Sequence, residues 1–218
     1  MTIRRCLRIF KSIYLILTFL IRNLWQAKTI PVIPKGKAED VEFLPCTKDL
    51  APCMVSLYPE FHQGNELGIA KRAMLPLAGK KLCLVVEDAI DKRVVGYSLY
   101  YFNHRDVKEK TVHEGDTGIL PEYQGRGIGT ALRLHALRHF ARSQTINGVS
   151  SRVSLNNLAS LKSNINLGFK EQERYYDPVM EEERVYLVCD LSPYRQNPTA
   201  QEIAIPNVKG ERITKNDA

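Results

Sequence analysis

A glycine-rich stretch, QGRGIG at residues 124–129, places the strongest constraint on the fold of this chain. It lies between an apolar segment ending at Leu120 and a long amphipathic pattern, so it joins a predicted strand to a predicted helix. A simple turn needs only one glycine. Three glycines clear the backbone where the first N–H groups of a helix lack partners, and Arg126 adds a charge. The stretch therefore predicts a loop that closes around phosphate.

Other phosphate-binding loops fit this sequence less well. The chain contains no GxxxxGK[ST], which disfavours a P-loop nucleotide-binding protein. The dinucleotide pattern GxGxxG is incomplete, and no acidic residue follows at the expected place. A glycine-rich turn without a ligand remains the alternative, but the position between a strand and a helix favours an anion site.

The remaining pattern predicts one mixed α/β domain built on a single sheet. Strands are expected at residues 41–46, 81–88, 94–102, 112–120, 148–155 and 184–191, and helices at 48–58, 65–78, 127–143 and 157–167. Residues 103–111 read as a polar loop. The 218 residues divide into a helix (1–28), a linker (29–39), the domain (40–191) and a polar tail (192–218).

The N-terminal segment 1–28 combines a narrow polar stripe with a wide apolar helix face. The stripe contains Arg4, Arg8, Lys11, Thr18, Arg22 and Gln26, and the apolar face contains Ile3, Leu7, Phe10, Ile13, Leu17, Leu20, Leu24 and Trp25. This arrangement predicts a helix on a membrane surface. The open alternatives are a signal peptide or signal anchor, docking on a partner or on a second copy of the chain, and packing on the domain.

Charge and cysteine content narrow the class of protein. The net charge of +7 is concentrated before Glu39, the first acidic residue, so the domain itself does not demand a nucleic-acid partner. The five cysteines are odd in number and show no CxxC or metal-ligand spacing. We expect a reducing compartment, no metal site, and a cytoplasmic protein that is peripheral on the inner face of the membrane if residues 1–28 bind there.

Two motifs carry a resemblance to a known family. GILPEYQGRGIGTALRLHAL (118–137) resembles the acetyl-CoA motif of the GCN5-related N-acetyltransferases, Q/R-x-x-G-x-G/A. NNLASLKSNINLGFK (156–170) resembles that family's N-x-x-A/S…G-F stretch. The resemblance covers residues 40–191. It implies a mixed, mostly antiparallel sheet flanked by helices, in which the strands at 112–120 and 148–155 splay apart.

The resemblance also implies acetyl-CoA as co-substrate and a set of residues that bind it. These are Ile119, Leu120, Gln124, Gly125, Arg126, Gly127, Ile128, Gly129, Thr130, Asn157 and Ser160. The backbone amides of 124–129 would bind the pyrophosphate, and those near 118–120 would hold the thioester carbonyl. Asn157 would face the cofactor from the later helix.

The catalytic base is expected on the strand 112–120. The family often places it six or four residues before the position of Ile119, which makes His113 the first choice and Glu114, acting through water, the second. Simple alternation puts His113, Gly115 and Thr117 on one face. A bulge at Gly115 would exchange the faces to which the side chains on either side of it point. The alternative to a catalytic His113 is a solvated residue at the end of the strand.

Other polar residues near the predicted site receive weaker interpretations. Asn164 stands where many family members have a tyrosine acid, and asparagine cannot supply that proton. Tyr175 and Tyr176 follow on a predicted loop and are candidates for that acid, but a place in the substrate pocket or in packing is favoured. In the segment 58–66, which commonly lines the family's acceptor site, Glu60, His62 and Glu66 are candidates to contact the amine, but solvated loop positions are favoured.

The sequence therefore predicts an N-acetyltransferase that moves an acetyl group directly from acetyl-CoA to a primary amine of a small molecule or a peptide. The alternatives are an acyl-CoA sensor on a degenerate fold and a membrane-recruited scaffold. Neither the acceptor nor a possible homodimer can be read from the sequence.

Overall fold

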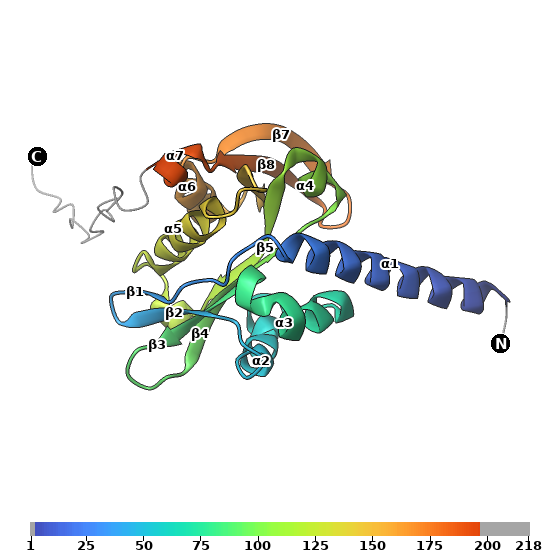
Figure 1. Cartoon of the computed structure of the whole chain (residues 1–218), viewed down its shortest axis with the longest axis horizontal. Coiled ribbons are helices and arrows are strands. Elements are labelled where there is room, and N and C mark those ends of the chain that lie inside the picture. Colours follow the sequence, from blue (N-terminus) through green and yellow to red (C-terminus); the bar gives the residue numbers. More distant parts are fainter. Residues whose placement is uncertain (1–2, 197–218) are drawn as a thin grey trace, which may run out of the picture.

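A computed structural model describes residues 3–196, with side chains described from Phe10 onward. An eight-stranded sheet forms its centre, in the order β1-β2-β3-β4-β5-β6-β8-β7 (Figure 1). The strands are β1 Gly36–Ala38, β2 Val41–Pro45, β3 Cys83–Asp88, β4 Val94–Tyr101, β5 Thr111–Ile119, β6 Gly148–Ser154, β7 Lys170–Asp177 and β8 Glu182–Asp190. The helices are α1 Ile3–Ala27, α2 Ala51–Phe61, α3 Ile69–Leu82, α4 His104–Glu109, α5 Ile128–Ala141, α6 Leu158–Asn166 and α7 Ser192–Gln196, with a short 3₁₀ turn at Pro121–Tyr123.

Helices cover both faces of the sheet, as neighbouring residues of β4 show. The ring of Tyr97 contacts Tyr58 and Phe61 of α2, whereas the ring of Tyr100 contacts Phe140 of α5. Because Tyr97 and Tyr100 differ by an odd number of positions, they point to opposite faces. We call these the α2 face and the α5 face. The mixed sheet with flanking helices confirms the predicted fold class.

The sheet opens at one place. Its strands pair antiparallel except for β5 and β6, which pair in parallel only from Thr111–Gly148 to Glu114–Ser151. Beyond that point β5 continues alongside β4 to Ile119, and β6 continues alongside β8 to Ser154. The two strands therefore splay, as the family resemblance implies.

A bulge at Gly115 sets the direction of the side chains around this opening. Glu114 pairs with Tyr100 and Asp116 pairs with Leu99, so Gly115 has no partner of its own on β4. Simple alternation along β5 was therefore wrong, and the alternative with a bulge is confirmed. His113 and Asp116 share the α2 face, whereas Glu114 and Thr117 share the α5 face, where the Thr117 hydroxyl donates to Glu114 at 2.8 Å.

Among the described side chains of helix α1, those that fix it to the domain lie in its C-terminal half. The buried Asn23 accepts a hydrogen bond from the N–H of Phe102 at 2.7 Å and donates to its carbonyl at 3.2 Å. Leu20 and Leu24 pack against the core, and α1 contacts α3. The N-terminal half extends away from the domain (Figure 1). Within residues 3–196 no helix is long and apolar enough to span a bilayer.

Several short elements lay outside the predicted pattern. Residues 103–111 contain α4, which begins at a capping box formed by Asn103 and Asp106. Residues 170–177 form the edge strand β7, although they were read as a loop, because their mostly exposed side chains carry no apolar pattern. The predicted linker contains β1 and the buried Ile30 and Ile33, and the predicted tail begins with α7. Its remainder, 197–218, lies outside the described residues.

We expect Gly115→Ala to destabilise the domain by about 2 kcal/mol, because over-packing is costly in a sheet core. A Cβ atom at Gly115 would lie 2.0 Å from the ring of Tyr101. Chemical denaturation measures the loss. Gly129→Ala is the matched control, since a Cβ there meets nothing within 4 Å in the first turn of α5, and it should be neutral or stabilising. Equal stability of the two variants would contradict the role given to the bulge.

Candidate active site

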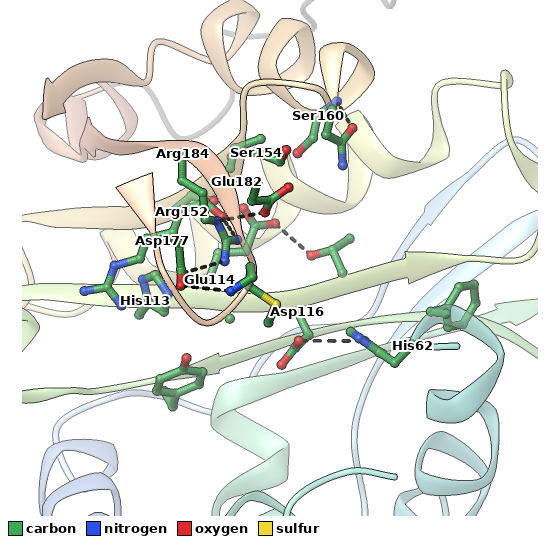
Figure 2. A pocket seen from close by; sticks show the side chains of 18 of the residues that line it. His62, His113, Glu114, Asp116, Arg152, Ser154, Ser160, Asp177, Glu182 and Arg184 are labelled. Carbon is green, nitrogen blue, oxygen red and sulfur yellow. Dashed lines mark hydrogen bonds and ion pairs between the residues drawn. The ribbon is translucent and has the colours of Figure 1, made fainter. Parts of the chain in front are cut away.

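A cleft of about 1010 Å³ lies where β5 and β6 separate. Its walls come from α2, α3, β5, β6, the β7–β8 hairpin and α5 (Figure 2). His113, Glu114, Asn157 and Ser160 all line it, so the structure brings both predicted catalytic residues together with two residues of the predicted cofactor set.

The loop before α5 presents unpaired backbone donors. Gly125 and Gly127 adopt φ angles of 74° and 75°, a region that favours glycine. Gly127 caps α5 without a side-chain hydrogen bond, and within residues 3–196 no backbone acceptor is bonded to the N–H groups of 125–130. The side chain of Gln124 holds the loop to β5 by donating to the Ile119 carbonyl at 2.8 Å. Such a row of amides at a helix N-terminus fits a diphosphate.

Two predicted loop residues already have side-chain partners. The guanidinium of Arg126 bonds the carboxylate of Asp40 and lies 3.5 Å from that of Glu39. The hydroxyl of Thr130 lies 2.9 Å from that of Ser163. The positive charge that Arg126 brings to the loop is therefore largely balanced before any anion binds.

The opening between β5 and β6 offers one backbone donor from β5. Leu120 donates its N–H to the Val95 carbonyl at 2.9 Å, so this amide is engaged. Because bonded and non-bonded pairs alternate in an antiparallel ladder, the Ile119 N–H points away from β4 and into the opening. Of the amides expected to hold a thioester carbonyl, Ile119 is thus the available one.

A network missing from the sequence prediction lines the α5 face of the cleft. Arg133 of α5 donates to Glu114 at 2.8 Å, to Ser163 at 3.0 Å and to Ser160 at 3.1 Å. Asn157 caps α6 by accepting from the Ser160 N–H. The other oxygen of Glu114 is buried without a partner, as is the side-chain oxygen of Asn164. The Glu114 oxygen belongs to a residue that lines the cleft and can accept a hydrogen bond from a ligand. Asn164 is fully buried and, because its side chain is an amide, it cannot act as an acid.

His113 is not a solvated strand-end residue, because only 3% of it is exposed. Its Nδ1 lies 2.8 Å from the hydroxyl of Ser150, which donates to the carboxylate of Asp106 at 2.6 Å. Since that donation uses the only hydroxyl proton, Nδ1 carries a proton and donates to Ser150. The basic lone pair therefore lies on Nε2.

The protonation state of His113 is set by its surroundings. Burial, with Arg152 and Lys71 nearby, lowers the pKa of His113 to about 3. The ring is neutral at physiological pH and can accept a proton. By contrast, the ion pair with Arg133 commits Glu114 to a structural contact.

On the α2 face, Asp116 and His62 form a pair that the sequence analysis did not predict. Asp116 binds Lys71 at 2.6 Å and lies 3.7 Å from His62 (Figure 2). His62 also lies 3.0 Å from the hydroxyl of Tyr97 and stacks on Tyr58. Reading His62 as a solvated loop residue was therefore wrong.

The two glutamates of that segment, Glu60 and Glu66, do not line the cleft. Glu60 is exposed and lines a separate surface pocket, and Glu66 is paired with Arg72 in solvent. On the β7–β8 hairpin, Tyr175 lines the cleft, whereas Tyr176 does not and is 56% exposed.

Comparison with known proteins agrees with this geometry. A model described as the acetyltransferase (GNAT) family matches residues 48–169. The thialysine N-epsilon-acetyltransferase of Bos taurus is 44% identical over 39 residues, which are 18% of this chain and 23% of that protein. The matched part thus spans less than a quarter of this curated relative.

Two solved structures share the fold. Arabidopsis thaliana NAA60 in complex with acetyl-CoA superposes with a TM-score of 0.60 and 12% identity, over 69% of this chain and 99% of that one. The diaminobutyrate acetyltransferase EctA from Paenibacillus lautus was solved with L-2,4-diaminobutyric acid and coenzyme A. It superposes with a TM-score of 0.56 and 12% identity, over 71% of this chain and 97% of that one.

The lowered pKa of His113 predicts a pH-dependent stability. The contribution of His113 to the free energy of unfolding is present in full above about pH 6.5 and is lost as the pH falls toward 3. Over this range the histidine binds a proton more tightly in the unfolded chain than in the folded one. The slope is at most about 1.4 kcal/mol per pH unit. Denaturation of His113→Asn, which keeps a donor for Ser150, should show a shallower dependence than the wild type. His139, whose pKa burial lowers to about 4, contributes equally in both proteins. Identical slopes would contradict the assignment.

Proposed function

This chain belongs to the acetyltransferase (GNAT) family, and we propose that it transfers an acetyl group from acetyl-CoA to a primary amine of a small molecule or a peptide. The observation that carries the proposal is the opening between β5 and β6. The unpaired amides of 125–130 lie at the start of α5, and His113 lines the cleft at the last paired rows of β5. This arrangement supports a two-substrate site, with the loop before α5 for the cofactor and the cleft for the acceptor.

We assign cofactor binding to the loop and to the α5 face of the cleft. The amides of 125–130 would hold the diphosphate, and the N–H of Ile119 would hold the thioester carbonyl. The unpartnered oxygen of Glu114, which lines the cleft, would accept from a pantetheine amide. Acetyl-CoA supplies an acetyl group on a thioester, which a neutral amine can attack.

His113 is the proposed base, and its tautomer fits the role. The chain from Asp106 through Ser150 leaves Nε2 free to take a proton from the attacking nitrogen. A weak base suffices because that nitrogen becomes strongly acidic once its bond to carbon forms. In the whole reaction a C–N bond forms, the C–S bond breaks, and the amine loses one proton while coenzyme A leaves as a thiol.

No separate acid is required in this scheme. The proton that His113 takes from the nitrogen balances the proton that the departing sulfur needs. This accounts for the buried Asn164 at the position where the family often has a tyrosine. Glu114 acts through Arg133, as a positioning residue for the α5 face.

Two variants, one expected to lose turnover and the other to lose coenzyme A binding, test the proposed roles of His113 and of the loop before α5. His113→Asn should keep its affinity for coenzyme A but lose at least about 100-fold in kcat, as expected on removal of a general base. Gly127→Val, which places a branched side chain at a φ of 75°, should lose coenzyme A binding. Calorimetry with coenzyme A and an amine screen with acetyl-CoA give the two measurements. Binding without turnover on any amine would favour the sensor alternative, and no binding would refute the proposal.

We further propose that α1 attaches the enzyme to an anionic membrane surface. Phe10, Tyr14, Leu17, Ile21 and Trp25 are each more than half exposed and repeat at steps of three to four residues, so they form one apolar stripe. No acidic residue precedes Glu39. An apolar stripe on a segment that carries only positive charges complements anionic headgroups.

Vesicle sedimentation tests this attachment. The wild type should bind vesicles containing phosphatidylserine more tightly than pure phosphatidylcholine, and the double change Phe10→Ser and Leu17→Ser should weaken binding at least about tenfold. Ile90→Ser with Val179→Ser is the matched control, because both residues are highly exposed elsewhere. A wild type that stays in the supernatant refutes the proposal. A concentration-dependent dimer abolished by the same double change would assign the stripe to a second copy.

A further inference from the structure

Among the described residues, Arg152 differs from the other cations of the cleft in forming no ion pair within 4 Å, although the Glu109 carboxylate is near enough for an electrostatic interaction. Each of the others is paired within 4 Å: Lys71 with Asp116, Arg105 with Glu173, Arg133 with Glu114, and Arg184 with Asp177 and Glu182. Among the described residues, no ion pair is formed by Arg152 and no hydrogen bond is donated by its side chain. Partial burial of a guanidinium with unused donors costs desolvation free energy, unless an anion accepts hydrogen bonds from those donors.

Aromatic packing holds Arg152 in place without occupying its donors. Its guanidinium carbon lies 5.6 Å from the ring centroid of Tyr186, and that of Arg105 lies 3.8 Å from the same ring. The hydroxyl of Tyr186 is fixed by donating to Glu109 at 2.7 Å. Contacts with a ring face leave the N–H fork of an arginine free to bind an oxyanion.

Arg152 also lies next to the proposed base. It follows Ser150 by two residues on β6, so the two side chains share the α2 face at a spacing of about 7 Å. Ser150 is the residue that accepts from His113. An anion held by Arg152 would therefore belong to the molecule whose amine meets His113.

We propose that the acceptor is an amino acid or a similarly small amine with its own carboxylate, and that Arg152 binds this carboxylate. The proposal rests on the acetyltransferase function proposed above and narrows its substrate class. It predicts selection by charge: a carboxylate pairs with the free fork, whereas a neutral carboxamide of the same shape leaves the guanidinium unpaired.

The test uses the full-length protein with acetyl-CoA and a series of acceptors from glycine to 6-aminohexanoate, together with lysine, each against its carboxamide. We expect the KM of the best amino acid to be about 10- to 100-fold below that of its carboxamide, the range of one charge-assisted bidentate contact. The optimal chain length would report the distance between amine and carboxylate.

Variants of Arg152 identify the residue responsible. Arg152→Met should raise the KM of the amino acid and erase the difference from its carboxamide, and Arg152→Lys should restore part of it, because lysine keeps the charge but not the fork. Arg174→Met is the matched control, since Arg174 is an exposed cation on β7 that does not line the cleft. Coenzyme A affinity and the denaturation midpoint of each variant verify that it is folded.

The outcomes separate this inference from the function on which it rests. Equal use of amino acids and carboxamides, or a preference that survives Arg152→Met, overturns the inference and leaves the acetyltransferase intact. The inference is also overturned, and the acetyltransferase function kept, if the amino acid series is inert while amines without a carboxylate, such as spermine or an amidated peptide, are acetylated. If no amine of either kind is acetylated, the proposed function itself fails.

Discussion

The loss of pairing between β5 and β6 is the constraint on which the site depends. As long as the two strands are bonded, from Thr111–Gly148 to Glu114–Ser151, they form a closed wall. Where they part, backbone groups that a continuous sheet would consume become available to a ligand, and Ile119 is the clearest case. The bulge at Gly115 falls at the same point of β5 and divides its acidic side chains between the two faces.

This division gives the cleft two chemically different sides. On the α5 face, Glu114 is bound to Arg133, whose other donors bond the hydroxyls of Ser160 and Ser163, so this side is polar and its charges are paired. On the α2 face, Asp116, His62 and Lys71 form a charged group that lines the cleft. In the function that we propose, one unpaired residue in a strand would thus separate cofactor recognition from acceptor recognition.

Local sequence signals predicted the glycine-rich turn before α5 and most strands, because each depends on a short-range pattern, whereas the choice of His113 came from the family resemblance. Glycine spacing before a helix is such a signal, and so is an apolar run. The pairs His62–Asp116 and Glu114–Arg133 had no such signal, since each joins residues far apart in the chain. Strand β7 was missed for a related reason. Its stability comes from pairing with β8, and its mostly exposed side chains carry no periodic apolar pattern.

The contact between Arg126 and Asp40 has a consequence for how an anion would be held. Since the nearest cation of the loop is already neutralised, the attraction must come mainly from aligned peptide dipoles. Fixed dipoles at short range are screened by dissolved ions far less than separated surface charges are. The affinity of this loop for a diphosphate should therefore vary little with ionic strength. Proteins that bind phosphate through unpaired lysines and arginines should show a stronger dependence.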